Sequence, residues 1–122
     1  MVNIIVTADS VIGSSVQLDD VVYSVEAANN GNRECISLCN QETGFFLRHK
    51  GGKLLDTDAK DNPNSFLDDS SWIPVACGDG YILHCSNAGM EDKFICKVGI
   101  NDFIINSDLV EYVIRKVNKK IN

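Results

Sequence analysis

An internal repeat with a period of about 45 residues is the feature that most constrains how this chain of 122 residues can fold. The most complete copy runs from Cys35 to Val75 and contains four short runs of apolar and β-branched residues, each bounded by turn residues. These runs are Cys35–Asn40, Phe45–His49, Lys53–Asp56 and Phe66–Val75. A repeat of this size indicates a fold built from copies of one supersecondary unit.

The rest of the chain contains similar runs in the same order. The last third holds Tyr81–Asn87, Lys93–Lys97, Asp102–Asn106 and Asp108–Ile114. The amino-terminal copy is shorter, lacks the first run, and holds Asn3–Thr7, Ser10–Gly13 and Asp20–Val25. We therefore divide the chain into three units, at about residues 1–30, 35–78 and 80–118.

Three units of about four short strands each predict an all-β fold, specifically a β-trefoil formed by a single domain, residues 1–122. Four strands per unit can close a six-stranded barrel and cap one end with three hairpins, which leaves few exposed strand edges. A domain of this length buries about two-thirds of the surface that its unfolded chain exposes. It therefore needs neither a disulfide nor a metal ion to fold.

The carboxyl-terminal run is compatible with a second structure. Apolar residues between positions 107 and 120 fall at helical spacing, with acidic residues first and lysines last, which is typical of an amphipathic helix. We favour a strand as far as Val117, because Tyr112, Val113 and Ile114 are β-formers and both other units have a strand here.

The charge of the chain disfavours several classes of partner. A net charge of -6 repels nucleic acid and anionic membrane surfaces, and we read the basic residues from Arg115 to Lys120 as a solvated tail. No run of about 18 apolar residues is present, so no membrane-spanning segment is expected. The first residues do not resemble a secretory signal. We expect a cytoplasmic protein, or a secreted one if a signal peptide has been removed.

The cysteines also indicate a reducing compartment. Their number, five, is odd and their spacing is not that of a compact disulfide framework, so most are expected in the core. Cys35 and Cys39 would share a face of one strand as a metal pair does. A structural zinc site needs four ligands, however, and neither histidine lies at a familiar offset. We predict no metal and no cofactor.

No motif indicates catalysis, and we predict that the chain is not an enzyme. His84 and Cys85 are adjacent on an expected strand and would point to opposite faces, so they cannot act as base and nucleophile. The loop from Thr57 to Ser65 is rich in oxygen ligands but lacks the ordered calcium-loop pattern, which favours a solvated turn. Asp56 is expected to cap a turn, and Arg48 to pair with an acid at the rim of the barrel.

The middle unit resembles the repeat of the α-L-arabinofuranosidase B-type domains. The likeness rests on Phe45–His49, which follows Asn40 and a short turn and precedes Phe66–Trp72. The family reads approximately Asn, Pro-Gly, Tyr-Leu-Arg-His, and then a strand with Asp-Ala-Thr/Ser-Phe. The resemblance covers most of the middle unit, extends loosely to the third, and reaches the first only in pattern.

The resemblance implies a β-trefoil that binds furanose sugars, in a family usually attached to glycoside hydrolases. It further implies that His49 and Asp69 hydrogen-bond sugar hydroxyls, while Phe46 or Trp72 offers an apolar ring face. A neutral sugar requires such groups, fixed in a shallow pocket. A lone Trp on an apolar strand is also typical of a core, which is the alternative interpretation of Trp72.

The other two units depart from this pattern. At the position of His49 the third unit has Lys97 and the first has Thr7 or Ala8, so at most one pocket is complete. Asp20 and Asp108 do fall near the position of Asp69. An acid that recurs without the histidine fits a structural duty at a turn better than sugar binding.

These observations predict a non-catalytic binding module, with a carbohydrate as its leading ligand and the middle unit as its site. The first alternative is a cytoplasmic protein-interaction trefoil, similar to the fascin-like and hisactophilin-like actin binders. The second is a trefoil protease inhibitor with the loop 57–65 as bait. We expect a monomer whose partner is a carbohydrate or a protein.

Overall fold

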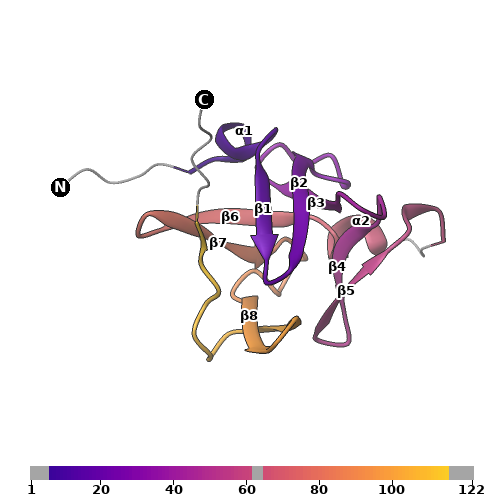
Figure 1. Ribbon diagram of the computed structural model, residues 1–122. Coiled ribbons are helices and arrows are strands. Elements are labelled where there is room, and N and C mark those ends of the chain that lie inside the picture. The colour runs from indigo at the N-terminus through magenta and orange to yellow at the C-terminus, as the bar shows by residue number, and fades with distance from the viewer. Residues whose placement is uncertain (1–5, 62–64, 116–122) are drawn as a thin grey trace.

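The computed structural model describes residues 6–61 and 65–115, and its architecture is all-β (Figure 1). Within these residues, ten strands form a single antiparallel sheet. The strands are β1 (Ser15–Leu18), β2 (Val21–Ala27), β3 (Ile36–Asn40), β4 (Phe46–Lys50), β5 (Lys53–Thr57), β6 (Trp72–Cys77), β7 (Gly80–Cys85), β8 (Phe94–Gly99), β9 (Asp102–Asn106) and β10 (Ile114–Arg115). The helical segments are α1 (Ala8–Val11), α2 (Phe66–Asp69) and a 3-10 turn at Ala59–Asp61. In the described part of the chain, no helix is long and apolar enough to span a bilayer.

The sheet closes on itself. Seven consecutive strands form a ring in the order β3, β4, β5, β9, β8, β7 and β6, and β6 returns to β3 through the pair Trp72 and Ile36. Three strands lie outside the ring. The hairpin of β1 and β2 joins it through the pairing of β2 with β3, and β10 joins it by pairing with β7. Closure leaves few free strand edges, and it confirms the all-β class expected from the sequence.

The second and third repeats of the sequence each give four strands, β3–β6 and β7–β10. Each unit contains a hairpin at matching positions, β4–β5 in one and β8–β9 in the other. The two hairpins meet where Lys53 of β5 pairs with Ile104 of β9. The repeated hydrophobic runs therefore place these elements correctly along the chain.

The first unit differs from the prediction. The run expected as a strand at Ser10–Gly13 begins in helix α1 and continues as a turn. The helix forms because the Thr7 hydroxyl accepts a hydrogen bond from the Ser10 N–H, and the Ser10 hydroxyl binds back to Thr7 in a capping box. The strands of this unit are β1, which the sequence patterns did not predict, and β2, which corresponds to the expected run Asp20–Val25. Most of the run expected at Asn3–Thr7, residues 3–5, lies outside the described residues.

A second correction concerns the start of the fourth run in the middle unit. Residues Phe66–Asp69 form the one-turn helix α2, and strand β6 begins only at Trp72. The hydroxyls of Ser70 and Ser71 donate hydrogen bonds to the backbone carbonyls of Phe66 and Leu67, at 2.6 Å each. Such bonds to a carbonyl four residues earlier hold a helical turn where β-propensity favours a strand.

The carboxyl-terminal segment contains no helix in residues 107–115; it bends at 107–109 and becomes a strand only at Ile114. Its strand is short, because only Ile114 and Arg115 pair with β7. The Tyr112 N–H also donates to the Ile95 carbonyl at 2.9 Å. The helical alternative is therefore not observed in residues 107–115, and the expected strand is limited there to Ile114–Arg115. Its expected continuation to Val117 and the lysines of the tail lie outside the described residues.

The core is centred on Trp72, which has no exposed surface. Its indole N–H donates to the Leu47 carbonyl at 3.2 Å, so the one polar group of this side chain is satisfied. Aliphatic side chains from most strands surround it, as the low aromatic content indicates. All five cysteines are free, and burial raises the pKa of the Cys85 thiol to about 12. A protonated thiol is a poor nucleophile, so Cys85 behaves as a small core residue.

Candidate functional site

His49 lies at the centre of a polar group that the fold assembles from two units. It stands on β4 with 5% of its surface exposed, and its ring meets that of Trp72 edge-on at 5.6 Å between centroids. His49 Nε2 lies 2.9 Å from Asn87 Oδ1 and 3.7 Å from Asp69 Oδ1. The two residues that the resemblance paired, His49 and Asp69, are therefore close in space.

The direction of these hydrogen bonds follows from the amide of Asn87. Its Nδ2 donates to Asp69 Oδ1 at 2.8 Å, so its oxygen is the atom that faces His49. An amide oxygen only accepts, and therefore His49 Nε2 carries a proton and donates it. The chain of bonds fixes the imidazole and orients the carboxylate of Asp69.

The second oxygen of Asp69 binds Arg48. Arg48 Nη2 donates to Asp69 Oδ2 at 2.8 Å, and the two side chains are 4% and 13% exposed. The guanidinium also lies over the ring of Phe66, 5.7 Å from its centroid, under helix α2. The expectation that Arg48 pairs with an acid is confirmed. We call Arg48, His49, Asp69 and Asn87 the polar cluster.

The members of the polar cluster differ in their access to solvent. Asp69 and Asn87 are half-buried, whereas Arg48 and His49 are buried behind them. A ligand would therefore meet the carboxylate and the amide first. Sequence reasoning missed Asn87, although it stands at the end of the first run of the third unit, where the middle unit has Asn40. The match in position between Asn87 and Asn40 is the sequence signal that could have identified Asn87.

The two predicted ring platforms have different positions. Trp72 is completely buried, so both faces of its indole are covered and the structure places it in the core. Phe46 is half-buried on β4 and packs edge-on against Phe66, with ring centroids 6.3 Å apart. Of the two rings, Phe46 is the one with surface to offer to a ligand.

Asp20 and Asp108, the acids near the position of Asp69 in the other two units, form their hydrogen bonds with asparagine residues and not with a histidine. The carboxylate of Asp20 accepts a hydrogen bond from the side-chain amide of Asn101 at 3.2 Å. Asp108 is exposed, and its N–H donates to Asn106 Oδ1 at 2.7 Å. Asp56 does not cap a turn as expected. It accepts hydrogen bonds from Tyr23 and Asn40, residues that are far away in the sequence.

Within residues 6–61 and 65–115, no three side chains of His, Cys, Asp or Glu are grouped as metal ligands. Cys35 is buried in the core and Cys39 is half-buried on β3. The chemistry that the polar cluster offers is hydrogen bonding, with an anionic acceptor, an amide and an imidazole held in one orientation. Comparisons of the chain with protein-family models, with curated proteins and with solved structures found no match.

Proposed function

We propose that this protein is a non-catalytic binding module with a β-trefoil fold, and that a carbohydrate binds at the polar cluster. The trefoil is supported by the matching order of strands in β3–β6 and β7–β10, by the closed ring, and by the contact between their hairpins. In this view α1, β1 and β2 make up the shortened first unit.

The observation that carries the proposal is the convergence of His49, Asp69 and Asn87 from β4, α2 and the loop after β7. A sugar hydroxyl both donates and accepts hydrogen bonds, so a binding site needs acceptors and donors side by side. The carboxylate of Asp69 accepts, while the amide of Asn87 does both. The choice of a furanose sugar rests on the resemblance of Phe45–His49 to its family's repeat.

The surroundings of the polar cluster favour affinity by fixing its geometry in advance. Trp72 supports the ring of His49 from the core, and Arg48 holds one oxygen of Asp69. Side chains that are already ordered lose little conformational entropy when a ligand binds. A sugar ring bound at Asp69 and Asn87 would find its apolar contact at Phe46, the half-buried ring on β4.

A glycan array that includes arabinofuranose oligosaccharides tests this proposal with the wild type and three variants. We expect saturable binding by the wild type, loss of at least about tenfold in affinity for Asn87→Ala, and a similar loss for His49→Ala. His84→Ala is the matched control, because His84 is the other histidine and bonds the Glu91 carbonyl away from the polar cluster. Thermal melts identify any variant that is merely unfolded.

Two results would overturn the carbohydrate proposal. The first is an array with no signal above background for the folded wild type. The second is binding that survives unchanged in folded His49→Ala and Asn87→Ala, since the sugar would then lie elsewhere.

A protein partner is the second candidate, favoured by exposed apolar side chains in the third unit. Ile100 is 85% exposed in the turn between β8 and β9, and Val110 is 83% exposed in the segment before β10. Single exposed apolar side chains are common on protein surfaces, so exposure alone does not identify an interface. The test therefore needs a variant in which one of these side chains is replaced. A pull-down in which a bound protein is lost with Ile100→Asp and retained with His49→Ala would support this candidate.

A further inference from the structure

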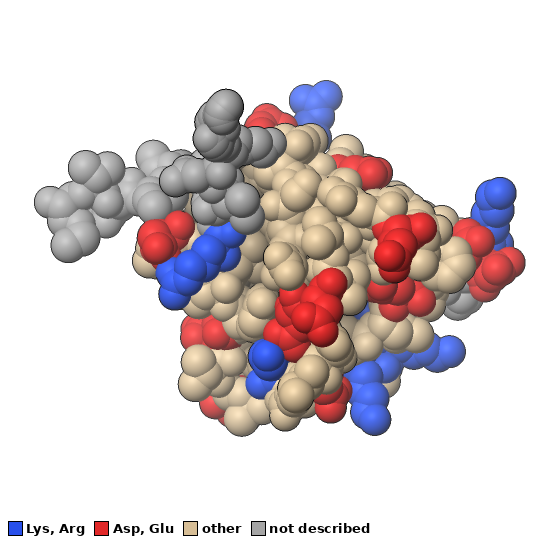
Figure 2. Space-filling model, in the orientation of Figure 1, with Lys and Arg blue, Asp and Glu red and all other residues tan. Residues whose placement is uncertain are grey.

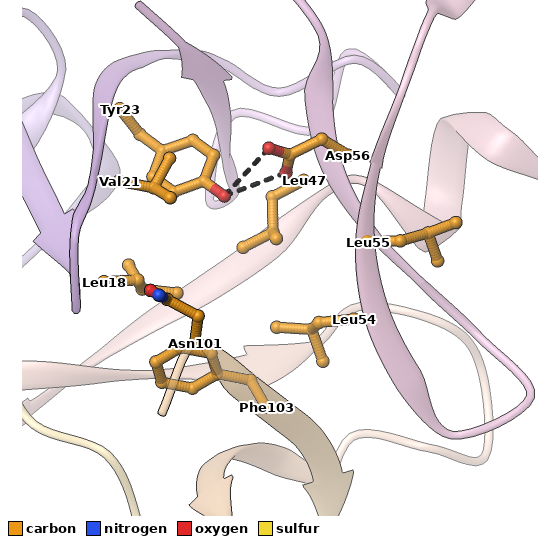
Figure 3. A pocket seen from close by; sticks show the side chains of 9 residues that line it. All are labelled: Leu18, Val21, Tyr23, Leu47, Leu54, Leu55, Asp56, Asn101 and Phe103. Carbon is orange, nitrogen blue, oxygen red and sulfur yellow. Dashed lines mark hydrogen bonds between the residues drawn. The ribbon is translucent and has the colours of Figure 1, made fainter. Parts of the chain in front are cut away.

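A hollow lies between the hairpins β1–β2, β4–β5 and β8–β9, and no residue of the polar cluster lines it (Figure 3). It has a volume of about 170 Å³. Its apolar walls come from β1, β2, β4, β5 and β9, and the side chains that form them are Leu18, Val21, Leu47, Leu54 and Phe103. An apolar cavity of about 150 Å³ accepts a benzene molecule, so this hollow suits a compact organic group.

Among the described residues, Asp56 contributes the one carboxyl group that lines this hollow. Tyr23 donates its hydroxyl to Asp56 Oδ1 at 2.8 Å, and Asn40 Nδ2 donates to Oδ2 at 2.9 Å. Both donors are neutral, and no Lys, Arg or His of the described residues forms an ion pair with this carboxylate. A carboxylate oxygen can accept two hydrogen bonds, so Asp56 retains capacity for a further donor.

The charge around the opening is negative as well. Asp20 and Glu42 line an adjacent groove that shares Val21 with the hollow, and neither forms an ion pair within the described residues. Lys97 acts electrostatically on Asp20 but is paired with Asp19. Figure 2 shows acidic side chains gathered in the middle of this face, over the turn between β1 and β2. A cation would be attracted to the opening.

The geometry points to a binding site for a small organic ammonium ion, with its apolar stem among Leu54, Phe103 and their neighbours and its nitrogen at Asp56. An uncharged ligand would contact the apolar walls but would leave the half-buried carboxylate of Asp56 without a counter-ion. An anionic ligand would be repelled by Asp56 and by the acids of the groove. A charge-assisted hydrogen bond is about twice as strong as a neutral one, which makes the ammonium group the selective element.

Benzylammonium chloride and benzyl alcohol are suitable probes, because they have the same ring and differ in charge. Titrated into the ¹⁵N-labelled wild type, benzylammonium should give saturable shifts of the backbone amides of Val21, Leu54 and Phe103. Benzyl alcohol should bind at least about tenfold more weakly. Since this comparison needs no variant, it decides the proposal even if a substitution prevents folding.

The variant Asp56→Asn identifies the group responsible. Asparagine keeps the shape of the side chain and can still accept a hydrogen bond from Tyr23. The affinity for benzylammonium divided by that for benzyl alcohol should therefore fall to about one. Asp79→Asn is the matched control, because it removes the same charge from an exposed side chain that pairs with Arg115. Equal affinity for the two probes, shifts that do not saturate, or a preference that survives in Asp56→Asn would each overturn the proposal.

Discussion

Asp19, in the turn between β1 and β2, forms an ion pair with Lys97 on strand β8, with Lys97 Nζ 2.6 Å from Asp19 Oδ1. The second oxygen of Asp19 accepts a hydrogen bond of 2.6 Å from the backbone N–H of Asn101. Asp20 completes the contact, since its N–H donates to Asn101 Oδ1. These bonds fasten the hairpin of the first unit to that of the third.

We expect this contact to contribute stability that depends on pH. Hydrogen bonds from Lys97 and from the Asn101 N–H hold the pKa of the Asp19 carboxyl below its usual value. Below about pH 4 the unfolded chain binds more protons than the folded chain. The free energy of unfolding therefore falls with pH until the pH reaches the lowered pKa of the folded state. The urea midpoint of Asp19→Asn should lie below that of the wild type at pH 7 and approach it at pH 2.5. The backbone at this position, with φ of 52°, tolerates asparagine.

The two buried tyrosines should respond in opposite ways to loss of their hydroxyl. Tyr23 donates to Asp56, whereas the hydroxyl of Tyr81 has no hydrogen-bond partner in the described part of the chain. An unsatisfied buried polar group costs stability, so Tyr81→Phe should leave the free energy of unfolding unchanged or raise it by about 1 kcal/mol. Tyr23→Phe should lower it by about 1 kcal/mol. Urea unfolding of both variants measures the difference, and equal changes would contradict the assignment.

Gly80 of β7 pairs with Arg115 of β10 and lies directly against the backbone of that strand. A Cβ built on Gly80 would collide with the Ile114 carbonyl and crowd the Val113 side chain. Gly80→Ala should therefore separate the two strands and destabilise the fold by about 2 kcal/mol, measured by urea unfolding. Gly99→Ala is the control, because the atoms nearest to its Cβ would be side-chain atoms of Asp102, none closer than 3.3 Å. A similar loss in both variants would rule out the steric explanation.

Local sequence patterns predict most of the strands correctly. Runs such as Cys35–Asn40 and Phe45–His49 combine β-formers with flanking turn residues, and both lie on strands of the ring. The same reasoning fails at α1 and α2, where short hydroxyl side chains decide the backbone. The hydroxyls of Thr7 and Ser70 bind backbone groups three or four residues away, and those bonds outweigh the propensity of Val11 or Phe66.

The candidate site is harder to predict because its contacts join different units. The family resemblance supplied His49 and Asp69, but Asn87, which bonds to both, comes from the third unit. Likewise nothing local in the sequence indicates that Asp56 meets Tyr23, which lies 33 residues away. Such pairs depend on how the units pack against one another. A single sequence does not show directly which residues of different units come into contact.

The ion pair of Arg48 and Asp69 allows a last prediction that separates fold from function. Both side chains are mostly shielded, so Asp69→Ala leaves the guanidinium of Arg48 under α2 without this partner. Removal of one member of a buried pair costs about 3 kcal/mol, and we expect a loss of that size in urea unfolding. Asp79→Ala, which breaks the exposed pair with Arg115, should cost far less. Asn87→Ala keeps the Arg48 pair, so it should lose carbohydrate binding with a much smaller loss of stability. If Asp69→Ala were as stable as the wild type, the pair would not support α2, and the fixed geometry proposed for the polar cluster would lose its basis.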